Sequence, residues 1–393
     1  MRGAYNPPFP FPLLQVFPMR FLIAVLVSLF SLSALAQTVP PPALAAKAWA
    51  LVDHATGQTL AEKDADARIE PASLTKLMTA YITFSKLKEG SLKPDQVVPV
   101  STKAWRMEGS RMFIEPNKPV SVDELIRGVI VQSGNDACVA LAETIAGSEE
   151  AFAALMNREA QRLGMTNTHF TNSTGLPDPQ LYTSARDLAV LASAIVRDFP
   201  EYYGLYSLKE FTYNGIKQPN RNRLLYMDPS VDGMKTGHTS SAGYCLVSTA
   251  RRGERRLVSV VLGAASDSVR AQESLKLLNF GYQFYETVKL YSADEALSKF
   301  RVWKGKLNEL PVGFTKDFAL TVPKEAANKI QVSLESRQPL VAPLQRGQEV
   351  GTLTVAVDGK PLGQYPVVAL QDVEVAGFFG RLWDAIVMFF KSL

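Results

Sequence analysis

The sequence predicts an α+β protein in which an antiparallel sheet flanked by helices is followed by a small all-β sandwich domain and a C-terminal amphipathic helix. Three observations carry this prediction. Strand patterns occur at both ends of the first 290 residues, helical patterns fill the interval between them, and short alternating runs follow. Strands from the two ends of such a segment meet in one sheet, and the helices cover it. A chain of 393 residues also exceeds one ordinary core.

The expected sheet consists of a hairpin and three later strands. Residues 48–63 contain two apolar alternating stretches around His54-Ala55-Thr56-Gly57, which is the pattern of a β-hairpin. The later strands are expected at residues 234–238, 244–250 and 255–262, with a turn at Arg252-Gly253-Glu254.

Helical patterns dominate the interval between these strands. Ser121 and Glu124 form a capping-box pattern that opens a helix through about residue 131. Gly147 and Gly164 are placed to end two further helices. These two helices are expected at residues 135–145 and 149–163. Further helical segments are expected at residues 77–84, 186–196 and 272–288.

The sequence pattern changes near Leu290 from helical segments to short alternating runs. Short alternating runs at residues 318–322, 330–334 and 351–357 are broken by Pro, Gly and Asn, as in a small β-sandwich. We therefore expect a first domain over residues 37–290 and an all-β domain over residues 291–375.

Residues 376–393 are expected to form an amphipathic helix. Arg381, Asp384, Met388 and Lys391 follow one side at helical spacing, and nearly everything else in residues 378–390 is bulky and apolar. This pattern is typical of a helix that lies in a membrane interface, and the segment is too short to span a bilayer comfortably. The alternative is a terminal helix that closes the core of the β domain.

The N-terminus has the features of a signal peptide over residues 1–36. Arg20 precedes the apolar run of residues 21–32, and Ala34-Leu35-Ala36 supplies small residues for cleavage. We therefore expect export. A permanent anchor is the alternative, but the run is shorter than a membrane span. Translation from Met1 or from Met19 is left open.

Composition excludes several classes of protein. A formal net charge of +4 on this length does not indicate nucleic-acid binding. The two cysteines, Cys138 and Cys245, can form at most one bridge, and a buried free thiol is the expectation for Cys138. Because the three histidines are far apart and no paired Cys motif occurs, neither a metal site nor a cofactor is predicted.

Three short motifs occur in one order along the chain: Ser73-Leu74-Thr75-Lys76, Ser133-Gly134-Asn135 and Lys235-Thr236-Gly237. Ser73 is expected at a helix N-terminus, with Lys76 one turn further on. A serine hydroxyl is a poor nucleophile and needs an adjacent base, which Lys76 can supply only when neutral. Burial, the helix dipole and the second cation Lys235 would all lower the pKa of Lys76.

The other two motifs complete an acyl-transfer site. The hydroxyl of Ser133 can pass a proton to a leaving amine, and the amide of Asn135 can orient the lysine, with Gly134 permitting a tight bend. Residues 235–237 are expected on an edge strand, where Gly237 lets an extended peptide lie against the backbone. The backbone N–H groups of Ser73 and His238 are candidate oxyanion donors.

Together the motifs identify a resemblance. The chain closely resembles the low-molecular-mass penicillin-binding proteins that are D-alanyl-D-alanine carboxypeptidases, whose peptidase domain has the β-lactamase/transpeptidase-like fold. The resemblance covers essentially the whole mature chain. It rests on Pro-Ala-Ser-Leu-Thr-Lys-Leu-Met-Thr from Pro71, Gln-Ser-Gly-Asn-Asp-Ala from Gln132, Gln-Pro-Asn-Arg-Asn-Arg-Leu-Leu from Gln218, Val-Asp-Gly-Met-Lys-Thr-Gly-His-Thr from Val231 and Gly-Phe-Phe-Gly-Arg-Leu-Trp-Asp from Gly377.

The resemblance implies a role for each motif. Ser73 would form an acyl-enzyme with the penultimate D-alanine of the peptidoglycan pentapeptide, and β-lactams would acylate the same serine. Lys76 would be the base, Ser133 the proton shuttle and Lys235 the electrostatic partner, with Asn135 also catalytic. The residues implied in substrate binding are Lys235, Thr236, Gly237, His238, Thr239 and Arg270, the last of which would meet the terminal carboxylate.

The resemblance also implies a location. The enzyme would be peripheral on the periplasmic side of the inner membrane, held by its C-terminal helix, and a homodimer is left open.

Alternative functions are left open as well. A β-lactamase is one alternative, because Glu210 and Asn214 have the spacing of a deacylating base motif, although their flanks alternate like a strand. The other alternative functions are a D,D-endopeptidase and an inactive peptidoglycan-binding module. For Arg270, the alternative is a surface position on the last helix.

Overall fold

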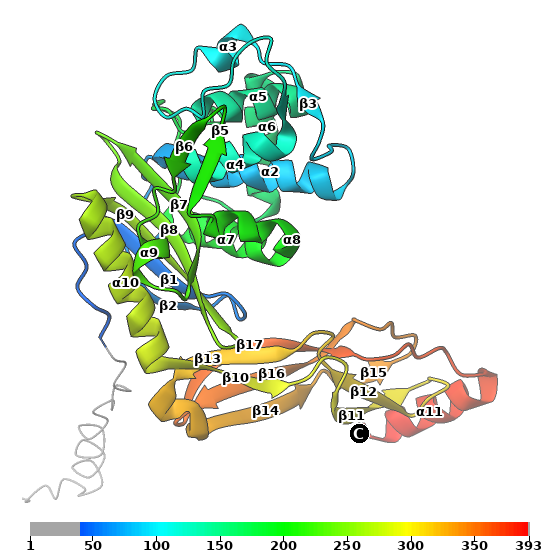
Figure 1. Ribbon diagram of the computed structural model, residues 1–393. Coiled ribbons are helices and arrows are strands. Elements are labelled where there is room, and N and C mark those ends of the chain that lie inside the picture. The colour runs from blue at the N-terminus through cyan, green and yellow to red at the C-terminus, as the bar shows by residue number, and fades with distance from the viewer. Residues whose placement is uncertain (1–39, 392–393) are drawn as a thin grey trace, which may run out of the picture. The chain divides into compact units, whose positions relative to one another are not determined.

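The computed structural model describes residues 40–391, so the expected signal peptide and both candidate start residues lie outside the described part of the chain. The first domain is built on a five-stranded antiparallel sheet in the order β2-β1-β9-β8-β7 (Figure 1). The expected hairpin and the three expected later strands are confirmed. Their bounds are β1 Ala48–Asp53, β2 Thr59–Lys63, β7 Val231–Thr239, β8 Gly243–Arg252 and β9 Arg255–Ala264.

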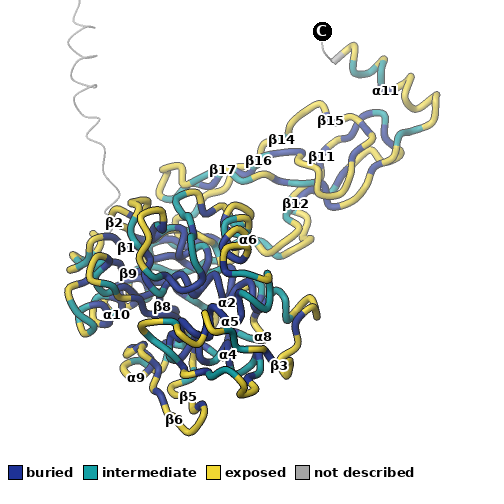
Figure 2. Tube along the Cα trace, turned by 90° about the horizontal axis from the view of Figure 1, so that it is seen from above, coloured by how far each residue is buried: buried dark blue, intermediate teal, exposed yellow. Residues whose placement is uncertain are grey.

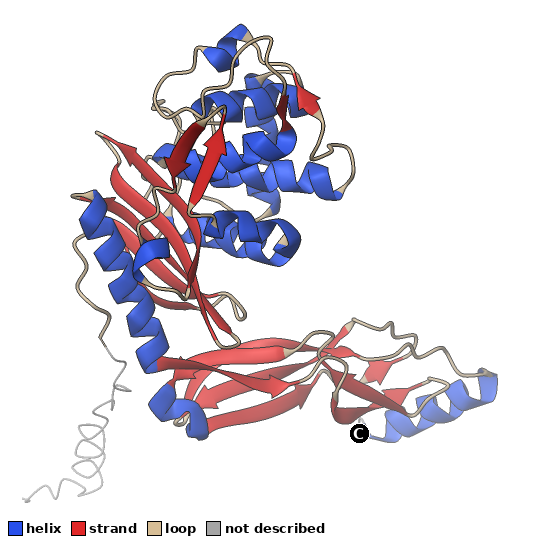
Figure 3. Ribbon diagram, in the orientation of Figure 1, coloured by secondary structure: helices blue, strands red, loops and turns tan. Residues whose placement is uncertain are grey.

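Both faces of this sheet are covered, which is why its inner strands β1, β8 and β9 are buried in continuous runs rather than at alternate residues. Every residue of β1 is buried, as are six consecutive residues in each of β8 and β9. Helix α10 (Asp267–Phe284) lies on one face of the sheet, and α7 (Ala185–Asp198) lies on the other (Figure 3). Strand β7 is the edge strand on one side of the sheet, as expected for the segment that carries Lys235.

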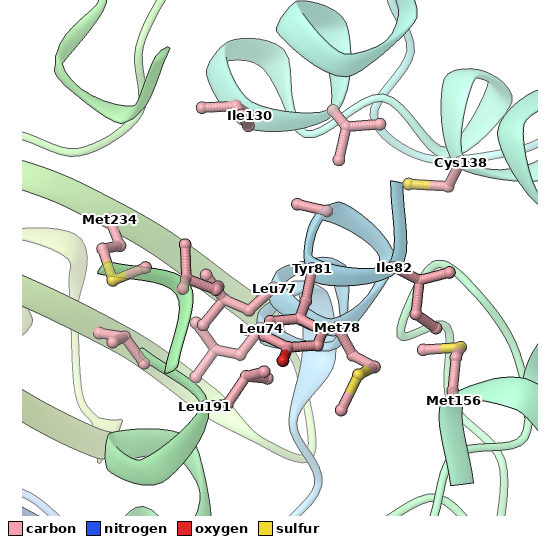
Figure 4. Close-up of a cluster of buried hydrophobic side chains, with 14 of the residues drawn as sticks. Leu74, Leu77, Met78, Tyr81, Ile82, Ile130, Cys138, Met156, Leu191 and Met234 are labelled. Atoms are coloured by element: carbon pink, nitrogen blue, oxygen red, sulfur yellow. The ribbon is translucent and has the colours of Figure 1, made fainter. Parts of the chain in front are cut away.

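The helices form one continuous apolar core with the sheet. Helix α2 (Lys76–Lys88) runs through its middle and is buried from Lys76 to Phe84. Figure 4 shows Leu74, Leu77 and Met78 in this cluster, and Figure 2 shows the same region as the buried interior of the domain. The other helices of this domain are α3 Thr102–Trp105, α4 Val122–Arg127, α5 Asn135–Ala146, α6 Glu149–Arg162, α7 Ala185–Asp198, α8 Pro200–Tyr203 and α9 Leu224–Met227.

Several expected helices differ from the structure in their bounds. Helix α2 extends to Lys88 rather than residue 84, and α10 begins at Asp267 rather than residue 272. The predicted capping box at Ser121 is present, but α4 ends at Arg127 and a π-helical turn, Gly128–Gln132, follows. The predicted end of the last helix at residue 288 is also wrong, because α10 stops at Phe284 and β10 (Tyr285–Tyr291) begins. Strand β10 pairs with β13 (Phe318–Pro323), so long-range pairing overrides the local helical pattern.

The C-terminal domain is all-β, as predicted. It contains the β10–β13 pair and a six-stranded sheet in the order β14-β16-β17-β12-β11-β15 around its own apolar core. The expected limit at residue 290 lies inside β10, so strand pairing favours a limit near Phe284. The six strands are β11 Ala296–Trp303, β12 Glu309–Gly313, β14 Ile330–Ser336, β15 Leu340–Val341, β16 Glu349–Val357 and β17 Lys360–Ala369.

The chain ends in α11 (Phe378–Lys391), which matches the expected terminal helix. Two minor two-stranded sheets complete the first domain, β3 (Val97–Val98) with β4 (Val120–Ser121) and the hairpin of β5 (Glu210–Tyr213) with β6 (Ile216–Pro219). Among residues 40–391, α11 included, no helix combines the length and the apolar character that a membrane crossing requires.

Candidate active site

Ser73 lies in a tight turn that the rest of the domain holds in place. The 3-10 turn Ala72–Thr75 leads directly into α2, so the expected position at a helix N-terminus is confirmed. Ala72 has a φ of +48°, a conformation that a residue with a side chain rarely adopts. Gly175 packs so closely on this turn that an added Cβ would lie 1.8 Å from Ala72 O. The surrounding chain therefore fixes the nucleophile turn.

Strand β7 packs on the other side of the same turn. An added Cβ on Gly237 would lie 3.0 Å from Pro71 O and 3.2 Å from Leu74 Cγ. The expected reason for this glycine, an approaching peptide, is therefore incomplete. Gly237 is required because the strand contacts the serine turn, and this contact brings the third motif next to the first.

Lys76 is buried next to Ser73 and has three polar partners. Its Nζ lies 3.1 Å from Ser73 Oγ, 2.7 Å from Asn135 Oδ1 and 2.5 Å from Thr174 O. The last two are carbonyl oxygens, which only accept hydrogen bonds. A neutral amine has two N–H groups, and these two acceptors occupy both. Its lone pair is then left for the hydroxyl of Ser73, which is the arrangement a base needs.

The electrostatics of the pocket favour this neutral form. Burial lowers the pKa of Lys76 from 10.5 to about 8, and the charge of Arg221 acts in the same direction, whereas Asp136 opposes it. Burial also lowers the pKa of Lys235 well below its usual range, and the charge of Lys76 lowers it further. Because two ammonium groups in one pocket disfavour each other, the pair gives up a proton more readily than an isolated lysine would.

The second motif orients this lysine. Asn135 Nδ2 donates to Glu108 O over 2.6 Å, which turns Oδ1 toward Lys76. The buried carboxylate of Asp136 accepts three backbone N–H groups of the segment that follows Glu108, at distances of 2.8 to 3.2 Å. Hydrogen bonds to Asp136 therefore hold the loop that orients the Asn135 amide against the start of α5.

The bend of this motif differs from the expectation. Gly134 has an ordinary φ of −61°, and the left-handed residue is Ser133, with a φ of +66°. Glycine is required at position 134 for space, because an added Cβ would lie 2.8 Å from Asp136 Oδ1. The left-handed turn presents the Ser133 hydroxyl to Lys235, whose Nζ donates to Ser133 Oγ and to Thr236 O, each over 2.9 Å.

These groups border a hollow of about 690 Å³. Of the residues predicted from the sequence, Ser73, Ser133, Thr236, Gly237, His238 and Arg270 line it. Lys76, Asn135 and Lys235 lie behind this lining and reach it through Ser73 and Ser133. Thr239 does not line it, and its hydroxyl donates to Glu70 over 2.8 Å.

Arg270 reaches the hollow from α10. Only 6% of the residue is exposed, so the surface alternative is wrong. Its Nη1 donates to Gly237 O over 3.0 Å, and its Nη2 pairs with Asp267. The guanidinium is therefore held at the edge strand by both the strand and its own helix.

Sequence reasoning missed several residues of the site. Thr174 O contacts Lys76 through its backbone, so its residue type carried no signal. Asn220, Arg221 and Arg223 all lie inside the Gln-Pro-Asn-Arg-Asn-Arg-Leu-Leu segment, so this motif could have revealed them. The other missed lining residues are Ser110, Tyr244 and Asp267. Cys138 and Cys245 are both free and buried, so the expected free thiol is confirmed.

The fold and the site define a class of protein: a serine hydrolase in which a buried amine, rather than an imidazole, lies next to the candidate nucleophile. Comparison with known proteins gives the family. The family model described as D-alanyl-D-alanine carboxypeptidase matches residues 35–266, and the model described as penicillin-binding protein 5, C-terminal domain, matches residues 285–375. The chain therefore belongs to the D-alanyl-D-alanine carboxypeptidase family and is a serine hydrolase and a penicillin-binding protein.

Individual relatives agree with this assignment. The D-alanyl-D-alanine carboxypeptidase DacC of Escherichia coli K12 is 46% identical over 364 residues, which cover 91% of each chain. The crystal structure of penicillin binding protein 5 from Haemophilus influenzae has a TM-score of 0.83 and 43% identity, and covers 86% of this chain and 99% of that one. Penicillin-binding protein D2 from Listeria monocytogenes, solved in its ampicillin-bound form, has a TM-score of 0.58 and 31% identity, covering 62% of this chain and 100% of that one.

Proposed function

We propose that this protein removes the terminal D-alanine from peptidoglycan stem pentapeptides through an acyl-enzyme on Ser73, and that β-lactams inhibit it by acylating the same serine. The observation that carries the proposal is the geometry at Lys76, where two carbonyl oxygens take its N–H groups and the Ser73 hydroxyl lies 3.1 Å away. The family assignment supports the substrate class. The ampicillin-bound relative supports the inhibitor class.

In the proposed first step, Lys76 takes the Ser73 proton as Oγ attacks the carbonyl carbon of the penultimate D-alanine. The backbone N–H groups of Ser73 and His238 would stabilise the developing oxyanion. Ser133 would then pass a proton to the departing amine, aided by the hydrogen bond from Lys235. Water releases the shortened peptide from the ester and restores the Ser73 hydroxyl.

Substrate binding is proposed on the edge strand and at its cationic end. The pentapeptide would extend along Thr236, Gly237 and His238, which all line the hollow. Lys235 would hold the hydroxyl of Ser133 in place, and Arg270 would bind the terminal carboxylate. Thr239 would act indirectly, through its hydrogen bond to Glu70 at the end of the strand.

The geometry disfavours the β-lactamase alternative. Glu210 lies in the exposed hairpin β5–β6, where its carboxylate pairs with Lys217 over 2.8 Å, and it does not line the hollow. It is therefore in no position to activate a deacylating water. The complete set of Ser73, Lys76 and Lys235 likewise disfavours an inactive binding module.

We also propose that residues 1–36 are a signal peptide and that residues 376–393 attach the exported enzyme to the periplasmic face of the inner membrane. The expected peptidase and all-β domains, 37–290 and 291–375, are proposed with their limit moved to the start of β10 at Tyr285. The orientation of α11 supports the attachment. Asp384 is buried and accepts a hydrogen bond from Lys304 N, whereas Phe379 and Trp383 are exposed. The helix thus docks through Asp384, and its exposed aromatic side chains stay available to a bilayer. A homodimer on the membrane remains a prediction.

One incubation tests the enzymatic proposal. The mature protein is mixed with a peptide ending in D-Ala-D-Ala and, separately, with a fluorescent penicillin. We expect release of D-alanine and one covalent fluorophore per chain, and both should disappear in Ser73→Ala. Ser91→Ala, on an exposed turn, is the matched control and should keep both. Rapid lactam turnover without D-alanine release would instead favour the β-lactamase.

A further inference from the structure

Glu70 lies three residues before Ser73 and connects the serine turn to the end of β7. Its Oε1 accepts a hydrogen bond from Thr239 Oγ1 over 2.8 Å, and its Oε2 accepts one from the hydroxyl of Ser241. Thr239 is the last residue of β7, and Ser241 lies in the turn between β7 and β8. Hydrogen bonds to a carboxylate are stronger than those between neutral groups. Both oxygens of Glu70 therefore hold the end of the edge strand.

The backbone fixes both sides of this connection. Ile69, next to Glu70, pairs with Thr183 through two hydrogen bonds of 2.8 and 2.9 Å. The Thr239 hydroxyl donates to Glu70 and accepts from Ala242 N over 3.0 Å, so its proton and one of its lone pairs are used. The hydrogen bond between these two segments therefore sets the position of one relative to the other.

This connection complements the packing of β7 on the serine turn. Gly237 lies against Pro71 O, and the contact limits how closely the strand can approach. Glu70 acts in the opposite direction, because its hydrogen bonds keep the end of the strand from moving away. In the described sheet β7 has a neighbouring strand on one side only, which is β8. The packing contact and the carboxylate together fix the separation of β7 from the serine turn.

The two segments joined by Glu70 carry the proposed oxyanion donors. His238, whose N–H would stabilise the oxyanion, directly precedes Thr239, and Ser73 would supply the other N–H. Such donors must lie about 2.7 to 3.1 Å from the developing oxyanion. A misplacement of about 1 Å can lower a rate about a hundredfold. The chemical step therefore depends on the separation that Glu70 sets.

We propose that Glu70 is a positioning residue for the oxyanion hole, which holds His238 N at the distance from Ser73 N that the oxyanion requires. The inference rests on the proposed function, because it uses the same two donors. Arg270 and the backbone of β7 would still bind the peptide without Glu70. Formation and hydrolysis of the acyl-enzyme both pass through an oxyanion, so loss of the carboxylate should slow both steps. It should therefore lower kcat and leave KM nearly constant.

The test separates rate from binding. Glu70→Ala and wild type are compared on a peptide ending in D-Ala-D-Ala, and kcat and KM are measured separately. We expect kcat to fall at least about tenfold and KM to change less than about threefold. A smaller fall in kcat, or a loss carried mainly by KM, would overturn the inference, provided that wild type releases D-alanine. Failure of wild type to release D-alanine would instead overturn the proposed function.

A conservative variant and a matched control locate the effect. Glu70→Gln keeps a carbonyl oxygen that can accept from Thr239, and should restore kcat to within about threefold of wild type. Asp66→Ala is the control, because Asp66 is a carboxylate of the same segment that pairs with Arg186 on the surface over 2.7 Å and does not line the hollow. It should change neither kcat nor KM. A Glu70→Gln enzyme as slow as Glu70→Ala would contradict the assignment.

A variant of Thr239 tests the same connection from the other side. Thr239→Val removes the hydroxyl and keeps the shape of the side chain, and should lower kcat at least about threefold in a protein with a cooperative thermal unfolding transition. The double variant with Glu70→Ala should be no slower than Glu70→Ala alone, because both changes break one connection. An unchanged kcat in folded Thr239→Val, or losses that multiply in the double variant, would overturn the inference.

Discussion

The catalytic site and the terminal helix α11 both depart from the usual burial of side chains. The site buries lysines, whereas α11 exposes aromatic residues. In the peptidase domain, Lys76 and Lys235 are only 1% and 3% exposed, although lysine is almost never buried. In α11, Phe379 and Trp383 are 83% and 67% exposed, although large aromatic side chains are normally buried. Each region is therefore less stable in isolation than an ordinary arrangement of the same residues would be.

This difference in burial indicates what each region would do in the proposed function. A buried ammonium costs several kcal/mol, and the site relieves this cost by lowering the lysine pKa, which produces a base. An exposed aromatic side chain forgoes about 1.5 to 3 kcal/mol of burial, which a bilayer interface can restore. In the proposed function, the buried lysines supply a base, and the exposed aromatic side chains of α11 supply a contact with the membrane.

The largest predicted effect is the loss of the base. Lys76→Ala should lower kcat/KM for a D-Ala-D-Ala peptide by at least about a thousandfold, because no other group accepts the Ser73 proton. The rate of acylation by a fluorescent penicillin should fall in parallel, as measured by quenched-flow labelling. Lys88→Ala, an exposed lysine on the same helix, is the matched control and should change neither rate.

A folded Lys76→Ala protein is essential to this comparison. A single cooperative unfolding transition checks this. Its midpoint is not the criterion, because the variant removes a buried cation but leaves Asn135 Oδ1 and Thr174 O without their donor. Unimpaired hydrolysis in a protein with a normal unfolding transition would remove Lys76 from the mechanism.

The next effect concerns the membrane. Replacing Phe379, Trp383 and Phe390 together by Ser should lower the partition coefficient onto vesicles of phosphatidylethanolamine and phosphatidylglycerol by at least about a hundredfold, since each side chain contributes burial energy. Vesicle sedimentation measures this, with D-alanine release in solution as the control that should stay constant. Equal sedimentation of variant and wild type would mean that α11 does not carry the attachment.

The smallest effect distinguishes the site from that of a β-lactamase. Glu210→Gln should change the rate at which a penicillin adduct is released by less than about twofold, because a surface ion pair contributes little. The measurement is the decay of the fluorescent acyl-enzyme. A large slowing would show that Glu210 reaches the acyl group and would revive the β-lactamase interpretation.

The sequence predicted those parts of the molecule that depend on local pattern. The capping box at Ser121 and the order of the three motifs could be read directly, because each is a spacing along the chain. The end of α10 could not, because β10 is a strand only through its pairing with β13. Nor could the contact of Thr174 O with Lys76, since a backbone carbonyl has no residue signature. Gly134 and Gly237 were singled out correctly as glycines that matter, but the close contacts that require them are visible only in three dimensions.

The central claim is that a neutral Lys76 accepts the Ser73 proton, and the pH dependence of acylation tests it most directly. Burial lowers the pKa of Lys76 to about 8, so the ammonium predominates below that pH and the neutral amine above it. The rate constant for labelling Ser73 with a fluorescent penicillin, measured by stopped flow, should therefore rise about tenfold per pH unit up to about pH 8 and then level off. A rate that is constant from about pH 6 to 9, or that falls as the pH rises, would contradict the account.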